Sequence, residues 1–250
     1  MPLNAKGDHM IFVQYDSYSD IGSREENEDS LQILKKVLSG KYLFAVADGL
    51  GGHGGGKTAS SAVAKLLKEK WSGNISAEEW SSLLQQSNTR VQNLQTEKCK
   101  MKTTLAGMMV DNDHFICAHV GDSRVYHFCN NELVSQTRDH SASQLAVMMG
   151  EIQPEEIRFH EARSHVLKAI GQEGTLKPEI REERLTRGNH AFLMCTDGFW
   201  EYITEPEMSQ CLSDSADPQT WLEKMREIAK TRMEPGNDNN TAIVVFLKKI

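Results

Sequence analysis

The feature that most constrains the fold is a series of strand-like segments that follow one another at short intervals in mid-chain. These apolar runs cover residues 103–110, 114–120, 124–128 and 133–136. The connections between them are short and polar, such as Asn130-Asn131, and are typical of hairpin turns. Because parallel strands need long crossover connections, these segments predict an antiparallel sheet.

Helix-like segments occur in pairs on either side of this region. Apolar residues recur at helical spacing over 57–71 and 77–96, and again over 205–212 and 218–232. Other strands are predicted at 11–17, 29–36, 42–47, 192–196 and 242–248, and a helix interrupted near Pro154 is predicted over 141–161. Grouped hairpins and paired helices favour an α+β fold over a doubly wound parallel sheet. Two antiparallel sheets packed together, with helices outside, would cover every apolar face.

The composition indicates one globular domain and disfavours some functions. The chain has 250 residues, 39% hydrophobic and 25% charged, and no Pro-, Ser- or Gly-rich linker divides it. Residues 1–10 resemble a tag or a disordered N-terminus, so 11–250 are expected to form the domain. The net charge of −7 argues against non-specific nucleic-acid binding, which needs clustered Lys and Arg.

The cysteines and the apolar runs bear on the cellular compartment. The five cysteines are widely spaced and form no CxxC pair, which argues against a zinc finger or redox motif and fits a reducing cytoplasm. No apolar stretch approaches the ~20 residues of a membrane-spanning helix, and the N-terminus lacks the apolar core of a signal peptide. A cytoplasmic protein without membrane association is therefore expected.

A glycine-rich turn within Phe44–Gly56 gives the first indication of chemistry. An apolar strand ends in Asp48, and His53 lies among the glycines that follow. A carboxylate at the tip of a buried strand is costly unless it is compensated, and a metal ion is a common compensation. The glycines would let the backbone come close to an ion or a phosphate. The alternative for this segment is a tight strand-to-helix turn with a capping Asp.

Acidic residues recur at the ends of several predicted strands. They are Glu28, Asp29, Asp48, Asp122, Asp197 and Asp238. Any one of them could simply form a turn, but an antiparallel sandwich can bring such strand ends together at one edge. Clustered carboxylates repel one another without a counter-charge, and oxygen ligands suit Mg²⁺ and Mn²⁺. The pattern therefore predicts a site for two or more divalent ions.

Two further residues suit phosphate chemistry. The guanidinium of Arg24 fits a bidentate grip on phosphate, and the titration range of His53 fits donation of a proton to a leaving alkoxide. The alternatives are a plain surface residue for Arg24 and a turn residue bonded to backbone for His53. His140 is interpreted as structural.

Together these segments resemble the bacterial type of the metal-dependent Ser/Thr protein phosphatases 2C, the PPM family. The motifs occur in the family's order over about Tyr15 to Leu247. They are Arg24–Asp29 (RxxNED), Phe44–Gly56 (DGxGGH), Thr103-Thr104 (TT), Val120–Arg124 (VGDSR), Asp139–Ser141 (DHS), Cys195–Gly198 (TDG) and Asp238–Thr241 (DNxT). The set as a whole is far more specific than any one motif.

The resemblance implies a fold and a role for each motif residue. The fold would be a four-layer α-β-β-α sandwich, with two central antiparallel sheets flanked by helix pairs. The resemblance implies that Asp48 would bridge two metal ions. The Gly49 carbonyl, Asp197 and Asp238 would complete the ligands of the first ion. Glu28 would serve the second ion, with Asp29 behind it. Asp122 with Asp197 would hold the third ion of bacterial members. Arg24 would hold the substrate phosphate, and His53 would be the general acid.

The implied reaction is hydrolysis of phosphoserine or phosphothreonine by a metal-bridged water, with Mn²⁺ or Mg²⁺ as cofactor. The implied partners of a monomeric enzyme are phosphorylated proteins, including a cognate Ser/Thr kinase or its targets. A pseudo-phosphatase that binds phosphoproteins without turnover is the first alternative, although such a protein should have lost a ligand. A two-metal nuclease is the second, although no basic stripe supports it.

One segment departs from the family pattern. The flap that should follow the DHS motif covers about 141–171, and its expected NVLTRALG-like end reads HVLKAIG at residues 165–171. This segment is one residue shorter and has His in place of Asn. The departure leaves the metal ligands intact and bears on flap conformation and substrate preference.

Overall fold

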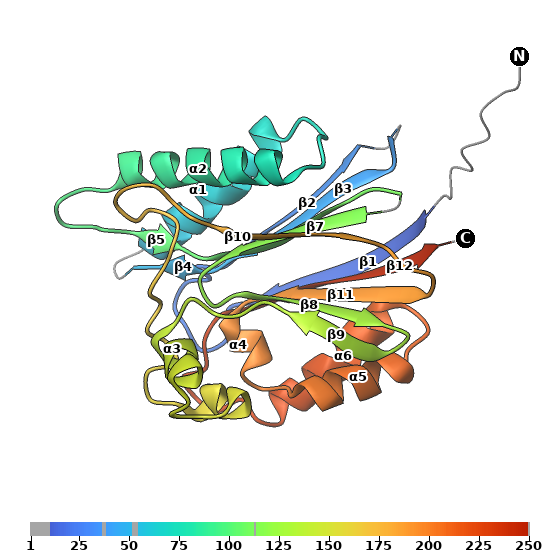
Figure 1. Ribbon diagram of the computed structural model, residues 1–250. Coiled ribbons are helices and arrows are strands. Elements are labelled where there is room, and N and C mark those ends of the chain that lie inside the picture. The colour runs from blue at the N-terminus through green and yellow to red at the C-terminus, as the bar shows by residue number, and fades with distance from the viewer. Residues whose placement is uncertain (1–10, 37–38, 52–54, 113, 250) are drawn as a thin grey trace, which may run out of the picture.

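The computed structural model describes residues 11–36, 39–51, 55–112 and 114–249. Two antiparallel sheets lie face to face at its centre (Figure 1). One, sheet A, has the strand order β1-β12-β11-β8-β9, and the other, sheet B, has the order β10-β7-β6-β3-β2. The strands of sheet A are β1 (Ile11–Asp20), β8 (Arg124–Cys129), β9 (Glu132–Gln136), β11 (Asn189–Cys195) and β12 (Asn240–Lys249). Those of sheet B are β2 (Ser30–Lys36), β3 (Lys41–Ala47), β6 (Leu105–Val110), β7 (His114–Val120) and β10 (Glu179–Arg184).

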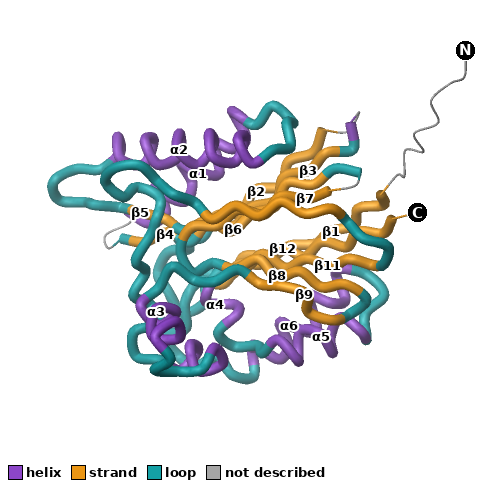
Figure 2. Tube along the Cα trace, in the orientation of Figure 1, coloured by secondary structure: helices purple, strands orange, loops and turns teal. Residues whose placement is uncertain are grey.

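A pair of helices covers the outer face of each sheet, as the layers in Figure 2 show. The helices α1 (Gly55–Lys70) and α2 (Ala77–Leu94) lie over sheet B, and α5 (Glu205–Ser213) and α6 (Pro218–Lys230) lie over sheet A. This arrangement is the expected α-β-β-α sandwich, so the predicted fold is confirmed. Among the described residues, no helix combines the length and the apolarity needed to cross a bilayer.

The core consists of three apolar layers that follow from this stacking. Strands of both sheets point large side chains into the middle layer, where Phe44, Met108, Phe192 and Ile243 are fully buried. The outer layers form where each helix pair packs on its sheet, around Trp80 on one side and Trp221 on the other. Burial of both sheet faces explains why β3 and β6 read as nearly continuous apolar runs.

Shorter elements gather at one end of the sandwich. They are β4 (Gly49–Leu50), β5 (Lys102–Thr103), α3 (Ala142–Met149), the 3₁₀ helix η2 (Pro154–Phe159) and α4 (Asp197–Trp200). The predicted strand 103–110 is interrupted at Thr104, and the helix expected over 141–161 ends already at Gly150. Gly150 has a φ of 77°, the left-handed conformation that terminates helices. The predicted interruption near Pro154 is therefore present, and the segment after it forms the short 3₁₀ helix η2, which begins at Pro154, in place of a second α-helical half.

Candidate metal centre

The acid-bearing strand ends converge on one cleft at this end of the sandwich. The cleft has a volume of about 530 Å³. Its lining includes Arg24, Glu28, Asp48, Gly49, Asp122, Asp197 and Asp238. These residues come from segments that are up to 214 positions apart in sequence, and the pairing of β1 with β12 brings the first and last of them together.

Hydrogen bonds from a neighbouring strand fix the backbone of Asp48 where β3 ends. Its N–H donates to the hydroxyl of Thr104 at 3.0 Å, and its carbonyl accepts from the Thr103 hydroxyl at 2.7 Å and the Thr104 N–H at 2.8 Å. The Thr103-Thr104 motif therefore holds the residue expected to bridge two ions.

Glycines allow the next segment to approach Glu28 and the start of α1. A side chain at Gly49 would bring its Cβ within 2.3 Å of the carbonyl carbon of Gly56, and one at Gly56 would come within 2.6 Å of Oε1 of Glu28. The Lys57 N–H donates to the same Glu28 oxygen at 3.3 Å. Close backbone packing thus explains the glycines here, whereas His53 itself lies outside the described residues.

Asp197 and Asp238 lie next to a second close approach of two backbones, between Gly198 and Asn239. Asp197 begins α4 and accepts a hydrogen bond from the Gly198 N–H at 2.7 Å. A Cβ at Gly198 would lie 2.0 Å from the carbonyl oxygen of Asn239, so only glycine fits there. The carboxylate of Asp238 pairs with Nη2 of Arg24 at 2.7 Å.

Asp29 does not line the cleft but lies behind it. Its side chain is buried, Oδ2 accepts from the Thr196 hydroxyl at 2.9 Å, and Oδ1 has no hydrogen-bond partner among the described residues. Burial raises the pKa of Asp29 to about 7. Its link to Thr196 connects it with the neighbouring residue Asp197.

The cleft strongly disfavours the charged form of its own carboxyl groups. Burial, followed by repulsion from Asp197, raises the pKa values of Asp48 and Asp122 well above the ordinary range. Burial likewise raises the pKa of Asp197 to about 6. Arg24 is the only cationic side chain among the described residues that line the cleft. Divalent cations fit this donor set, because hard ions prefer carboxylate and carbonyl oxygens and would neutralise the repulsion.

The sequence did not single out several residues that shape this cleft. Asn239 accepts from the Glu28 N–H at 2.8 Å and donates to the carbonyls of Ile21 and Glu26, so it ties the two ends of the chain together at the cleft. It lies within the DNxT motif, which was the available signal. Ser164 and Val166, in the segment expected to form the flap, also line the cleft, and only the three-dimensional arrangement reveals them.

Comparison with known proteins agrees with this architecture. The model of the family "Protein phosphatase 2C" matches residues 18–247. The serine/threonine phosphatase stp of Listeria monocytogenes is 29% identical over 233 residues, which cover 89% of this chain and 90% of that protein. The crystal structure of serine/threonine phosphatase Stp1 from Staphylococcus aureus superposes with a TM-score of 0.84 at 26% identity, covering 95% of this chain and 96% of that one.

A third comparison concerns a catalytic domain of the serine/threonine protein phosphatase PstP, solved in complex with two manganese ions. It covers 96% of this chain and 100% of that one, with a TM-score of 0.81 and 24% identity. At this identity the likeness shows the fold.

The fold and the acid-lined cleft define a hydrolase of the class that acts on phosphoproteins. The chain belongs to the protein phosphatase 2C family.

Proposed function

We propose that the chain is a Mg²⁺- or Mn²⁺-dependent phosphatase that hydrolyses phosphoserine and phosphothreonine in proteins. The observation that carries this proposal is the single cleft that collects Asp48, Asp122, Asp197 and Asp238 beside Arg24. When bound, divalent ions supply Lewis-acid polarisation of phosphoryl oxygens and lower the pKa of a water ligand.

Each residue of the cleft has a role in this proposal. Asp48, the Gly49 carbonyl, Asp197 and Asp238 would hold the first ion, and Asp48 would share the second with Glu28. Asp29 would support this set from behind, through Thr196. Asp122 and Asp197 would hold a third ion, an assignment supported by the buried Oδ1 of Asp122 that lacks a partner among the described residues.

Arg24 would bind the phosphate of the substrate. Its guanidinium already contacts a carboxylate at the rim of the cleft, and its side chain is 55% exposed, so it is accessible to a phosphoprotein. A guanidinium can donate two parallel hydrogen bonds to phosphate oxygens and stabilise the charge that develops on them. His53 would give a proton to the leaving serine or threonine oxygen, a role that rests on the motif.

Turnover of a phosphothreonine peptide tests the proposal. We expect hydrolysis with Mn²⁺, its abolition by EDTA, and a loss of at least about 10³-fold in the Asp197→Ala variant, because a ligand of two ions is removed. Asp214→Asn is a matched control, since this carboxylate contacts Gln210 on the outside of the sandwich. Robust activity in EDTA would contradict the proposal, and so would cleavage of DNA in place of the peptide.

The role of His53 has its own test. A His53→Ala variant should lose more activity on an alkyl phosphate than on an aryl phosphate, because an aryl leaving group needs little protonation. Equal losses on both substrates would refute the general-acid role.

The proposal also covers the domain organisation, cellular compartment, oligomeric state and partners of the enzyme. Residues 11–250 would form one phosphatase domain with a flap at about 141–171, and the enzyme would act as a cytoplasmic monomer on a cognate Ser/Thr kinase or its targets. The edge strand β10 supports the monomeric state, because Glu179, Arg181 and Glu182 give it a charged edge that resists pairing with another sheet.

A further inference from the structure

The backbone of Gly121 and Asp122 is held on two sides by His140 and Trp200, which are not among the described residues that line the cleft. On one side, His140 donates its N–H to the carbonyl of Gly121 at 2.8 Å and accepts the Gly121 N–H on Nδ1 at 3.1 Å. On the other, the indole Nε1–H of Trp200 donates to the carbonyl of Asp122 at 3.0 Å. Asp122 is only 2% exposed, and Oδ1 of its carboxylate has no hydrogen-bond partner among the described residues.

The backbone at Gly121 has little freedom to move. Its φ is 102°, and a Cβ there would meet Cγ2 of Thr104 at 2.6 Å. Thr104 is the residue that also holds Asp48, through its hydroxyl. The position of Asp122 is therefore set relative to Asp48 by close packing.

The Trp200 side of this arrangement is equally rigid. The indole is 1% exposed, and the guanidinium of Arg124 lies 3.4 Å from its ring centroid. Arg124 makes two hydrogen bonds of 2.8 Å to the carboxylate of Asp139, the residue before His140. Trp200 and His140 are thus joined through Arg124 and Asp139 into one frame around the Asp122 turn. Trp200 is also the last residue of the short helix α4, whose first residue is Asp197.

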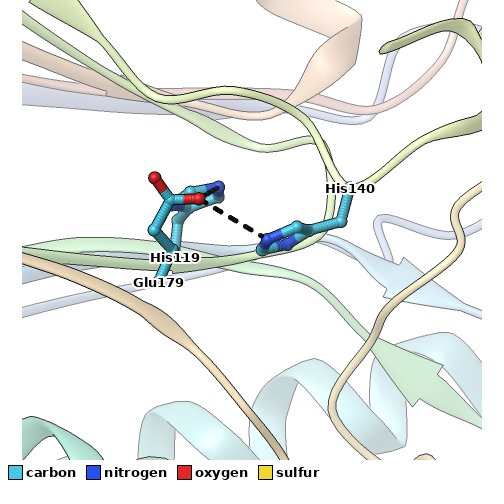
Figure 3. A group of neighbouring side chains, drawn as sticks. All are labelled: His119, His140 and Glu179. Carbon is cyan, nitrogen blue, oxygen red and sulfur yellow. Dashed lines mark ion pairs between the residues drawn. The ribbon is translucent and has the colours of Figure 1, made fainter. Parts of the chain in front are cut away.

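Figure 3 shows His140 stacked on His119, with Glu179 beside both rings. Their ligand atoms lie within 4.8 Å of one another, a spacing that also suits a metal site. The hydrogen bonds exclude this use in the present arrangement. Nε2 of His119 donates to the carbonyl of Arg138 at 2.8 Å, and Nδ1 of His140 accepts the Gly121 N–H, so the proton of neutral His140 is on Nε2.

Protonation of His140 would disrupt its bond to Gly121, and the structure disfavours it. Burial, followed by repulsion from His119, lowers the pKa of His140 to about 3. Around the ring, Glu179 lies 3.8 Å from Nε2, while His119 and Lys168 oppose a positive charge. His140 therefore remains a neutral acceptor for the Gly121 N–H.

We propose that Trp200 and His140 are positioning residues that set the affinity of the cation site formed by Asp122 and Asp197. This inference rests on the proposed metal-dependent function, and it adds two residues that touch neither ion nor substrate. Mutation of residues that orient a metal ligand without touching the metal commonly changes metal affinity 10- to 100-fold.

Manganese titration of the substrate-free protein tests Trp200. We expect Trp200→Phe to weaken one class of Mn²⁺ sites about 10-fold and to leave the remaining sites unchanged. Asp122→Asn identifies that class, because it should abolish the same sites. Trp221→Phe is the matched control: its indole is also fully buried and donates to a backbone carbonyl, that of Met208, at 3.0 Å. Equal titration curves for Trp200→Phe and Trp221→Phe would overturn the proposal for Trp200.

A second pair of variants tests His140 independently of how Trp200→Phe folds. His140→Asn retains an acceptor near the Gly121 N–H and should keep most of the Mn²⁺ affinity, whereas His140→Leu should lose about 10-fold at the same sites. Equal affinities for both variants would overturn the role of His140.

Binding of Mn²⁺ is measured without substrate, so this inference and the proposed phosphatase function can fail separately. A wild-type protein that binds Mn²⁺ but does not hydrolyse the phosphopeptide would refute the phosphatase function and leave this inference standing.

Discussion

At the scale of single residues, His127 and His190 form a buried, hydrogen-bonded pair away from the cleft. His190 donates from Nε2 to the Thr186 carbonyl at 3.1 Å, so its Nδ1 is an acceptor for Nε2–H of His127 at 2.9 Å. The His127 ring stacks on Phe192, with centroids 4.4 Å apart. Burial, then repulsion from His190, lowers the pKa of His127 to about 4.

The lowered pKa of His127 predicts acid sensitivity of the fold. The unfolded chain takes up this proton below about pH 6.5, whereas the folded chain takes it up only near pH 4, so stability falls as the pH drops through that window. The full effect is about 3 kcal/mol at the acid end. His127→Gln keeps a donor for His190 but does not titrate. Urea unfolding at several pH values should show this variant losing less stability than wild type between pH 6.5 and 4, and parallel pH profiles would contradict the assignment.

At the scale of elements, α4 is the shortest helix of the site and is the most constrained by its surroundings. Its first residue is Asp197, and its second is the glycine that contacts Asn239. Beyond its C-terminal end, the flap residue Arg158 donates to the carbonyls of Trp200 and Ile203, each at 3.1 Å, and pairs with Glu205 at 2.7 Å. The segment proposed as the flap therefore holds, through Arg158, the helix that carries a proposed ligand.

A methyl group at Gly198 should separate the two backbones that carry Asp197 and Asp238. We expect Gly198→Ala to destabilise the protein by about 3 kcal/mol and to weaken Mn²⁺ binding, because the Cβ would meet a backbone oxygen that cannot move alone. Gly174→Ala is the control, since a Cβ there meets nothing within 4 Å and its φ of 80° should cost only about 1 kcal/mol. Equal effects in denaturant unfolding would show that the contact at Gly198 is unimportant.

Loss of Arg158 should loosen the flap from the core. Arg158→Gln leaves the half-buried Glu205 without its shortest ion pair, for which we expect a cost of about 3 kcal/mol in urea unfolding. Arg163→Gln removes the more exposed pair with Glu201 and should cost less than about 1 kcal/mol. A smaller loss for Arg158→Gln than for Arg163→Gln would contradict this view of the flap.

Elements with a strong apolar pattern were predictable from sequence, and those defined by contacts were not. The run that became β7 is nearly continuously apolar, and the run that became α6 has apolar residues at helical spacing, so the existence of both elements followed directly. The edge strand β10 reads EIREER and was missed, because its charged residues hide the alternation. The acids of the cleft recur at strand ends and could be singled out. Trp200 could not, because only the fold brings its indole to the Asp122 carbonyl.

At the scale of the whole molecule, the cleft concentrates carboxyl groups at one end of the sandwich, with Arg24 as the single cationic side chain among its described lining residues. Ions that bind only the folded protein stabilise it by mass action. We expect Mn²⁺ at about 100 times its Kd to raise the Tm of the EDTA-treated protein by roughly 5–10 °C. Asp48→Asn with Asp122→Asn should raise the Tm of the metal-free protein and abolish the shift. Differential scanning calorimetry measures both effects, and a metal-free Tm equal to that in Mn²⁺ would contradict the expectation.

The strand order of sheet A has a consequence for the protein during its synthesis. The strand β12 lies between β1 and β11, so sheet A remains divided until β12 has left the ribosome. Sheet B, in contrast, has all its strands once Arg184 has been made. A nascent chain can therefore assemble one half of the sandwich early but cannot place Asp238 beside Asp48 until β12 has been made. The order of the strands thus delays assembly of the proposed metal centre, and a nascent chain that still lacks β12 would not hydrolyse phosphoproteins.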